Sequence, residues 1–496
     1  MNSIWKESVK DKFYYDSLDK DINCDVCIIG AGIFGITCAY YLDQLGLKVV
    51  VIDKDSIGKT TSFTTGKITS QHGLFYSYLY NAFGEKVAKD YLDVNEQAIK
   101  NIKDIIVKEN ISCDFKMQNN YVYTTEPSDL KILQKEQEIL EKLDFNSDLV
   151  TKVGLPFKIA GSICFKNQAQ FNPLKYLYGL CKKISLHGSN IFFNTTAIDI
   201  KHFDGTYITH TYNNTISSKY VIVATHYPFL KIPGFYFSKL YQSTSYIIAI
   251  DPKKTLFNGM YINMGTPSLS FRTADFNNKK LLLIGGGNHK TGQSISYEES
   301  YGYLEYEAKK LYPNCDILYK WNTEDCISLD KLPFIGQYSG LMPNVYVGTG
   351  FKKWGMTLSN VAANIIVDNI MGNYNKYTYL FTPSRMKPIK NFKETKNMLT
   401  DSANSLIFRK FKNPELYFEN IPLNSGGIIE INNSKVGIYK DNDGKIYAVN
   451  PICTHLGCLL SWNDIDKTWD CPCHGSRFDY TGKNIYDPAF KNLETY

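Results

Sequence analysis

Arginine is scarce in this chain of 496 residues. Lysine supplies nearly all of its 55 basic side chains, and arginine stands at four positions only, Arg272, Arg385, Arg409 and Arg477. No block of like charges is present, and a formal net charge of +6 is small for this length. These absences give no indication of a nucleic-acid partner.

Long apolar runs are also missing. The first 21 residues are polar and mixed in charge, without the apolar run of a signal peptide. No stretch of about 18 apolar residues is available for a membrane span. Outside one segment near the end, the cysteines are scattered singly, which argues against a secreted disulfide framework. The sequence therefore predicts a cytoplasmic protein without a membrane span.

The composition is otherwise that of a folded protein. Hydrophobic residues make up 44% and charged residues 21% of the chain, which is ordinary for globular domains. The length predicts two to four domains.

Two cysteine- and histidine-bearing loops near the C-terminus are the most informative stretch. Residues 453–458 read CTHLGC and residues 471–476 read CPCHGS, so each loop supplies a Cys, a His and one further Cys. Thiolates and imidazoles in one segment indicate a transition-metal site. Two Cys and two His suit a 2Fe-2S cluster with Cys on one iron and His on the other. A zinc ribbon also combines Cys and His, but its usual spacings differ.

The last 92 residues, 405–496, resemble the Rieske iron-sulfur family. The resemblance implies a small all-β domain and a role for each Cys and His of the two loops. These roles are Cys453 and Cys471 as ligands of the inner iron, His455 and His474 as ligands of the outer, solvent-facing iron, and Cys458 and Cys473 as a disulfide that bridges the loops.

A second motif lies near the N-terminus. An apolar run at 25–29 precedes Gly30-Ala31-Gly32-Ile33-Phe34-Gly35, a helix-like stretch follows to about residue 45, and the apolar run 47–52 ends at Asp53. This strand, glycine turn, helix, strand and acid predict a dinucleotide site, with pyrophosphate at the helix N-terminus and Asp53 on a ribose. A second glycine-rich stretch, LLLIGGGNHKTG at 281–292, lacks the third glycine and predicts no nicotinamide site.

Two further stretches identify the dinucleotide as FAD. The Thr/Ser/Gly-rich loop 56–73, and the segments PFIG at 333–336 and VYVGTGF…WGMT at 345–357, resemble motifs of the D-amino-acid-oxidase-like (DAO) flavoproteins. The resemblance covers about residues 22–372. It implies FAD contacts by Gly30, Gly32, Ile33, Phe34, Gly35, Asp53, Lys54, Thr60, Thr61, Thr64, Thr65, Lys67, Ala197, Ala224, Thr225, Gly348, Gly350, Phe351, Gly355, Met356 and Thr357.

Together the two resemblances predict an α/β Rossmann-like FAD-binding domain with an α+β antiparallel-sheet substrate domain, plus a small all-β Rieske domain. We assign residues 1–75, 151–230 and 326–372 to the FAD-binding domain, 76–150 to a helical part of the substrate domain, 231–325 to its sheet, 373–404 to a linker and 405–496 to the Rieske domain.

Three residues are candidates for substrate chemistry. Arg272, in an expected strand, could hold a substrate carboxylate bidentately, or it could be an ordinary surface or interface residue. Lys67 could interact with flavin or activate dioxygen, or it could bind phosphate or lie on the surface. His72 could line the substrate side of the flavin, or it could be a satisfied loop histidine.

The DAO resemblance implies oxidation of a C–N bond in a small amine or amino acid. We expect a dehydrogenase in which electrons pass from FAD to the 2Fe-2S cluster and on to an outside acceptor. In an alternative, a Rieske-fed flavin reductase or monooxygenase component, electrons run from cluster to flavin. A third possibility is a structural or redox-sensing cluster. Neither the substrate nor the acceptor is apparent from the sequence.

One position departs from the high-potential Rieske pattern, in which a Ser and a Tyr donate hydroxyl hydrogen bonds to cluster or ligand sulfur. Ser476 matches the Ser, but Phe478 stands where the Tyr would be. Hydrogen bonds to sulfur stabilise the reduced, more negative cluster and raise its potential. We therefore expect a lower potential than that of the respiratory Rieske proteins.

The variant Phe478→Tyr tests this expectation. One added hydrogen bond is worth about 1 kcal/mol net, which for one electron is about 40 mV, so the midpoint potential should rise by that order. The measurement is a redox titration followed by EPR, with Phe478→Leu as a control that adds no hydroxyl. An unchanged or lower midpoint in Phe478→Tyr would contradict the idea.

Overall fold

The structure is a computed structural model that describes residues 2–10, 12–186, 188–292, 297–385, 418–432 and 434–496. Most of the predicted linker, from 386 to 404, and the start of the predicted Rieske domain therefore lie outside the described residues. Below, residues 2–385 are called the two-sheet unit and residues 418–496 the C-terminal unit.

The first sheet of the two-sheet unit has a parallel centre. Its main path runs β16-β17-β10-β1-β2-β7, and β8 and β9 extend it from β10. Strand β1 pairs in parallel with both β10 and β2, and its last four residues are buried, as expected for a strand covered on both faces. The bounds are β1 Ile22–Ile29, β2 Val49–Ile52, β7 Asn190–Phe192, β8 Ala197–Phe203, β9 Thr206–Thr211, β10 Thr215–Val223, β16 Phe334–Ser339 and β17 Met342–Thr349.

Three helices pack together beside this sheet. Helix α2 (Ile33–Gln44) starts directly after the glycine turn and contacts α6 (Pro173–Leu186) and α8 (Gly355–Met371). Helix α2 carries mostly apolar and small side chains on all its faces, and ten of its twelve residues are buried. A helix that is apolar on all sides is a core helix. Its N-terminus is thereby fixed at the carboxyl end of β1.

The second sheet has the order β15-β11-β14-β13-β12-β4-β6-β3, with β5 paired to β6. All its pairs are antiparallel except β12 with β4. The bounds are β3 Lys67–Ile68, β4 Lys116–Thr124, β5 Asp148–Val150, β6 Gly161–Gln170, β11 Leu240–Asp251, β12 Met260–Asn263, β13 Leu269–Phe276, β14 Lys279–Lys290 and β15 Asp316–Ser328.

The remaining helices are mostly amphipathic and pack with one face against the rest of the two-sheet unit. Helix α4 buries one apolar stripe and exposes charged residues, and α7 contacts β14 and β11. Short α1 at the N-terminus buries Ile4 and Trp5. The bounds are α1 Ile4–Ser8, α3 Tyr76–Phe83, α4 Glu85–Lys108, α5 Leu130–Lys142, α7 Tyr297–Leu311 and α9 Thr378–Phe381, with 3₁₀ turns at Thr61–Phe63, Pro127–Asp129, Tyr236–Ser238 and Phe418–Asn420.

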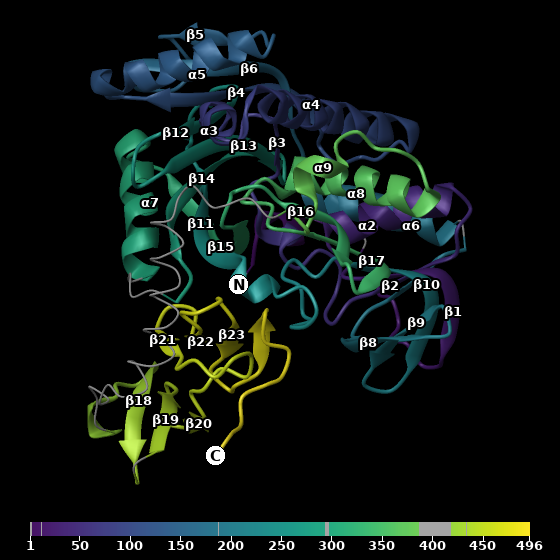
Figure 1. Ribbon diagram of the computed structural model, residues 1–496. Coiled ribbons are helices and arrows are strands. Elements are labelled where there is room, and N and C mark those ends of the chain that lie inside the picture. Colours follow the sequence, from purple (N-terminus) through teal and green to yellow (C-terminus); the bar gives the residue numbers. More distant parts are fainter. Residues whose placement is uncertain (1, 11, 187, 293–296, 386–417, 433) are drawn as a thin grey trace.

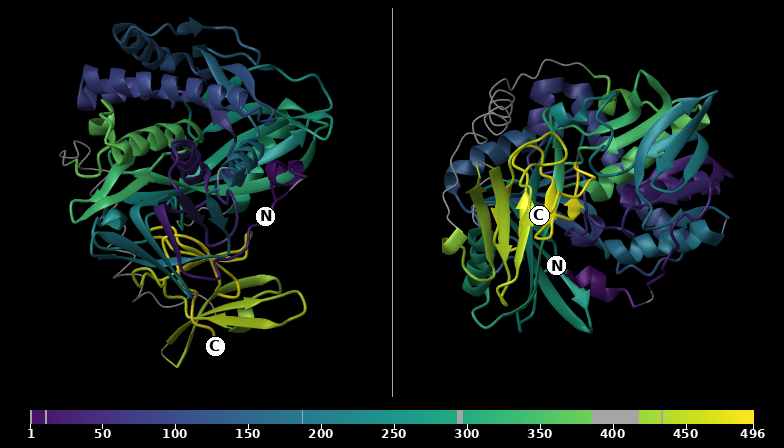
Figure 2. Two further views of the ribbon diagram at one scale, coloured as in Figure 1. Left: turned by 90° about the vertical axis from the view of Figure 1, so that its right-hand side faces the viewer. Right: turned by 90° about the horizontal axis from the view of Figure 1, so that it is seen from below.

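The C-terminal unit contains only strands and 3₁₀ turns among its described residues. One sheet has the order β18-β19-β20 and the other β21-β22-β23-β24. In Figures 1 and 2 this unit lies at one end of the molecule, next to β11 and β15, whereas α4 and α5 lie at the opposite end. The bounds are β18 Ser425–Ile431, β19 Ser434–Lys440, β20 Ile446–Val449, β21 Ser461–Asn463, β22 Thr468–Asp470, β23 Arg477–Asp479 and β24 Asn484–Tyr486.

This architecture confirms the predicted fold class, but two segment assignments need correction. Residues 151–230 were assigned wholly to the FAD-binding domain, yet β6 pairs with β4 in the second sheet. The predicted linker began at 373, yet Arg385 binds Asp330 through two hydrogen bonds of 2.6 and 2.8 Å and lies over the Phe334 ring. The described part of that segment, 373–385, is therefore packed against the rest of the two-sheet unit.

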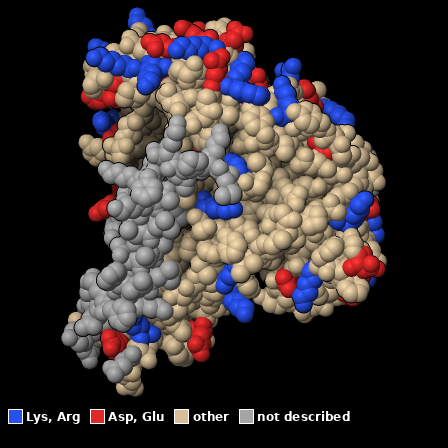
Figure 3. Space-filling model, viewed as in Figure 1, with Lys and Arg blue, Asp and Glu red and all other residues tan. Residues whose placement is uncertain are grey.

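The surface fits the absence of one-sided charge in the sequence. On the face seen in Figure 3, Lys and Arg side chains are interspersed with Asp and Glu. Within the described ranges, no helix combines the length and the apolar character that a membrane crossing requires.

Candidate functional site

The glycine turn after β1 shows why its residues must be small. Gly30 has φ +118°, and a Cβ there would lie 2.4 Å from the carbonyl oxygen of Ala224. A Cβ on Gly35 would lie 2.0 Å from the carbonyl oxygen of Gly30. The glycines thus let β1, β10 and α2 approach one another.

Asp53 closes this motif at the end of β2. Its carboxylate accepts hydrogen bonds from the backbone N–H groups of Ala31, at 2.7 Å, and Asp55, at 2.9 Å. Burial raises the pKa of Asp53 to about 6, although the two N–H groups oppose this rise. Asp53 is therefore anchored to the glycine turn itself, and its contact with a ribose stays a prediction.

Among the described residues, one large pocket begins at this turn and runs to the second sheet. It is lined by most of the residues that we expected to contact FAD. The exceptions are Gly35, Gly350 and Thr357, which do not line it. Individual FAD contacts remain predictions, but the structure brings residues from positions 30 to 356 together around one space. That space extends from the dinucleotide motif to the N-terminus of α8.

Lys67 lines this pocket, as expected for a flavin-proximal residue. Its Nζ donates hydrogen bonds to the carbonyl oxygen of Tyr261, at 3.0 Å, and to Oγ of Ser270, at 2.6 Å. Burial lowers the pKa of Lys67 well below its usual value, and the charge of Arg272 adds to the effect. The charged, protonated form of the Lys67 amine is therefore disfavoured at this site.

Arg272 does not serve as the predicted carboxylate ligand. Its Nη1 donates to the carbonyl oxygens of Thr65, Gly66 and Phe171 at 2.8–3.1 Å, and its Nε donates to that of Thr273 at 3.0 Å. The side chain is 3% exposed and is not part of the pocket lining. The guanidinium is turned into the backbone because those buried carbonyls need donors, so the role we predicted is wrong.

His72 is likewise a structural residue. Its ring nitrogens lie 2.7 Å from the Tyr91 hydroxyl and 2.8 Å from the Thr69 carbonyl oxygen, and the ring stacks on Trp354. Burial lowers its pKa to about 3. His72 does not line the pocket, so the satisfied-loop alternative holds and the substrate-side prediction is wrong.

Among the charged pocket residues that the sequence did not single out are Asp325 on β15 and Lys353 before α8. Nothing in the sequence separated them from other Asp and Lys residues. An unusual backbone marks one of them, because Lys352 and Lys353 have φ of +46° and +70°, a conformation that non-glycine residues adopt mainly where the surroundings demand it.

The two Cys-His loops of the C-terminal unit have the same local build. Each begins with a Cys whose N–H bonds to a carbonyl oxygen five residues on, at 2.8 Å, and each turns at a glycine that donates to that Cys carbonyl oxygen at 2.9 Å. The turning residues are Gly457 and Gly475, with φ of +78° and +82°. Cys458 and Cys473 form a disulfide, as expected, with Sγ atoms 2.07 Å apart.

The four predicted ligands converge between these loops. The His455 and His474 rings have centroids 5.0 Å apart, and their Nδ1 atoms are buried without a partner among the described residues. The pKa of the Cys453 thiol is lowered, mainly by a hydrogen bond with Cys471. The other two sulfurs nearby, of Cys458 and Cys473, form the disulfide and are therefore not free to act as ligands. Two thiols and two orphaned imidazole nitrogens are the donor set that a Rieske-type 2Fe-2S cluster requires.

The histidines do not face solvent, which corrects the expectation that they hold a solvent-facing iron. His455 is 6% and His474 5% exposed. Phe237 of the two-sheet unit lies edge-on to both rings at 6.3 Å, and Tyr227 lies 6.5 Å from that of His455. Docking of the C-terminal unit covers the histidine edge, which the sequence of that unit alone could not indicate.

Glycines allow the two units to approach this closely. A Cβ on Gly475, beside His474, would lie 2.7 Å from Cβ of Gln242. A Cβ on Gly292, after β14, would lie 2.5 Å from Cα of Pro472. The cluster loop is thus in backbone contact with the second sheet.

The docked unit also lines the large pocket, through Ile485, Tyr486, Asp487 and Phe490. Asp487 forms an ion pair of 2.6 Å with Lys54, the residue after Asp53, and its carbonyl oxygen accepts a hydrogen bond of 2.7 Å from Gln242. One wall of the expected FAD site therefore belongs to the domain that carries the cluster ligands.

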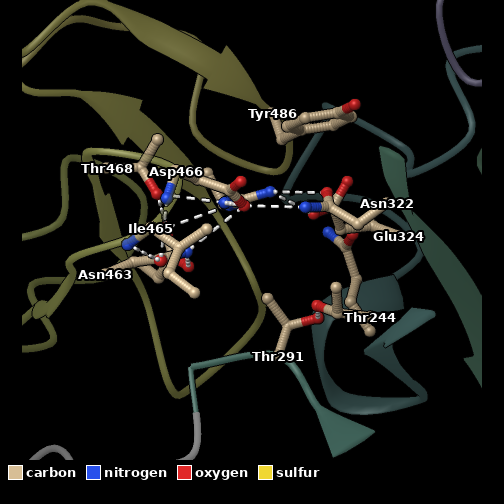
Figure 4. Close-up of polar contacts among 12 residues, drawn as sticks. Thr244, Thr291, Asn322, Glu324, Asn463, Ile465, Asp466, Thr468 and Tyr486 are labelled. Atoms are coloured by element: carbon tan, nitrogen blue, oxygen red, sulfur yellow. Dashed lines mark hydrogen bonds and ion pairs between the residues drawn. The ribbon is translucent and has the colours of Figure 1, made fainter. Parts of the chain in front are cut away.

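A buried charge cluster holds the two units together (Figure 4). Arg477 of β23 donates to Glu324 of β15 at 2.7 Å, to Asp466 at 2.6 Å and to Asp470 at 2.9 Å. Arg477 is 1% exposed and Glu324 is fully buried. Burial raises the pKa of Glu324 to about 7 and outweighs Arg477, because one guanidinium is shared among three carboxylates.

The comparisons with known proteins match both units. The family model described as FAD dependent oxidoreductase (DAO) matches residues 25–369, and the model described as Rieske [2Fe-2S] domain matches residues 418–496. YhfW of Bacillus subtilis (strain 168), described as a Rieske 2Fe-2S iron-sulfur protein, is 38% identical over 493 residues, 99% of this chain and 97% of YhfW.

Two further matches cover most of this chain. A gamma-glutamylputrescine oxidoreductase of Escherichia coli (strain K12) is 22% identical over 382 residues, 73% of this chain and 87% of that protein. The crystal structure of glycine oxidase from Geobacillus kaustophilus covers 74% of this chain and 100% of that chain, with a TM-score of 0.63 and 15% identity. The likeness to glycine oxidase shows the fold. The gamma-glutamylputrescine oxidoreductase is a distant relative in sequence.

The charge cluster yields a stability prediction. Arg477→Met should cost about 3–5 kcal/mol, because three carboxylates lose their shared cation inside the protein. The measurement is the urea midpoint of the holoprotein. Lys253→Met, which breaks the exposed pair with Asp316, is the control and should change stability by no more than about 1 kcal/mol. Equal midpoints for the two variants would contradict this account of the interface.

Glu324 should make stability depend on pH. Its pKa is about 7 in the folded state and near 4.5 when unfolded, so between these values the unfolded state binds fewer protons and stability falls as pH rises. The fall is on the order of 3 kcal/mol. In Glu324→Gln, urea midpoints measured from pH 4.5 to 7 should lose this component. The same slope in variant and wild type would argue against it.

Proposed function

Because the chain belongs to the DAO family of FAD dependent oxidoreductases and ends in a Rieske [2Fe-2S] domain, we propose that it oxidises a small amine or amino acid and passes the electrons from FAD to its own cluster. FAD accepts a hydride from carbon as two electrons, whereas a 2Fe-2S cluster carries one electron at a time. An outside acceptor then takes the electrons from the cluster.

One observation carries this proposal: the histidine edge of the cluster site is turned inward. Phe237 and Tyr227 cover His455 and His474, and residues of the same domain line the pocket where FAD is expected. Electrons reach a Rieske cluster most directly through its ligands. Such burial supports the two-sheet unit itself as the partner at this edge.

Substrate class is supported by the relatives. One distant relative is a gamma-glutamylputrescine oxidoreductase, and the fold is shared with glycine oxidase. Both names concern compounds with an amine nitrogen on an oxidisable carbon. An amine or amino acid is therefore the substrate class that we propose for this chain.

Electrons could also run from the cluster to the flavin, in a reductase or monooxygenase component. The inward histidine edge fits either direction, because an electron-transfer contact is reciprocal. We favour oxidation of an amine because the DAO match covers the whole two-sheet core.

The test is anaerobic addition of candidate amines to the purified holoprotein, followed by visible absorption and EPR. We expect flavin bleaching first and a Rieske-type EPR signal second. In His455→Ala, which removes a cluster ligand, the flavin should still bleach but electrons should no longer reach the native acceptor. Unchanged turnover with that acceptor would show that the cluster is structural or sensory, and cluster oxidation coupled to substrate hydroxylation would favour the reverse direction.

A further inference from the structure

The large pocket has two chemically different ends. The dinucleotide motif forms one end, at Gly30, Asp53 and Ala197. The second sheet and the residues before α8 form the other, which we call the sheet end and define by Lys67, Ser245, Ser270, Gly285, Asp325 and Lys353. A substrate of the proposed function must bind at the sheet end, because FAD is expected to bind the dinucleotide motif at the other end.

Asp325 is the carboxylate of the sheet end. It projects from β15 beside Ser245 of the neighbouring strand β11, whose hydroxyl donates to Oδ2 at 3.0 Å. Among the described residues no Lys, Arg or His nitrogen lies within 4.0 Å of its oxygens. Burial raises its pKa to about 6, while Lys353 and Ser245 oppose the rise. At neutral pH it is thus an ionised, half-buried acceptor with one hydroxyl partner.

The cations of this end are poorly suited to hold a substrate carboxylate. Arg272 does not line the pocket, and its Nη1 donates hydrogen bonds to backbone carbonyl oxygens. Burial lowers the pKa of Lys67 well below its usual value, and its Nζ is already bonded to Ser270. Lys352 and Lys353, before α8, also line the pocket. The Nζ of Lys352 lies 3.7 Å from the centre of the Phe75 ring, and burial lowers the pKa of Lys353. No fork-shaped donor of the kind that binds carboxylate bidentately lines the pocket among the described residues.

We propose that Asp325 binds the ammonium group of the substrate and accepts a proton from it. The carboxylate takes the proton onto an oxygen, the substrate nitrogen becomes a neutral amine, and no electron moves in this step. A neutral nitrogen keeps the lone pair that stabilises the carbon as its hydride departs. The inference rests on the proposed function for the oxidation itself, and it names the substrate class as amines recognised through nitrogen rather than through a carboxylate.

Two probes that share a tert-butyl group and carry opposite charges test this. tert-Butylammonium has no hydrogen on the carbon that bears nitrogen, so it can bind but cannot be oxidised, and pivalate is its anionic counterpart. The oxidised holoprotein is titrated with each at pH 7.5, and the change in flavin absorbance gives a Kd. This readout involves no cluster and no turnover, so its failure is distinct from failure of the proposed function.

We expect tert-butylammonium to bind and pivalate to bind at least tenfold more weakly. Asp325→Asn should weaken tert-butylammonium at least tenfold, about 1.4 kcal/mol, without weakening pivalate. Asp148→Asn, at an exposed pair with Lys166, is the control and should match the wild type. In the wild type the affinity for the cation should fall as pH drops below about 6, because Asp325 becomes protonated.

Several results would overturn the inference. These are tighter binding of pivalate than of tert-butylammonium, no cation-induced change in the wild type, or less than a twofold effect of Asp325→Asn. If Asp325→Asn does not retain FAD, Ser245→Ala decides the matter. Loss of its hydrogen bond to Oδ2 should shift the pH midpoint of cation binding upward, and an unshifted midpoint would exclude Asp325.

Discussion

The arrangement of the whole molecule depends on one buried cation. Arg477 stands three residues after His474, a predicted cluster ligand, and its guanidinium reaches across the interface to Glu324 of the second sheet. Breaking such a pair inside a protein leaves uncompensated charge, which costs far more than an exposed pair contributes. Because β23 also carries the cluster loop, the same contact fixes where that loop meets the two-sheet unit.

Docking through Arg477 has two consequences for chemistry. It turns His455 and His474 towards Phe237, and it places residues of the C-terminal unit in the wall of the pocket where FAD is expected. A cofactor site and a cluster site that are separate in sequence thereby become neighbours. The exposed edge expected of an isolated Rieske domain is absent from the docked protein.

The corrected side chains share a cause. Arg272 and His72 each had the right chemistry for a substrate site and the right position in sequence, but buried backbone carbonyls and hydroxyls compete for the same donors. Asp325, by contrast, has few partners and faces the pocket. Which polar side chains remain available is decided by how the surrounding backbone groups are satisfied, and a single sequence does not display that balance.

The sequence alone determined the elements whose chemistry is local. The glycine turn from Gly30 to Gly35, the acid at Asp53 and the two Cys-His loops are short segments in which spacing dictates the backbone, so fold class and both cofactors could be predicted from them. Only the tertiary structure decided the exposure of His455, the partners of Arg272 and the position of Asp325. These depend on contacts between segments hundreds of residues apart, and the energies of such contacts arise from burial and pairing that no local pattern encodes.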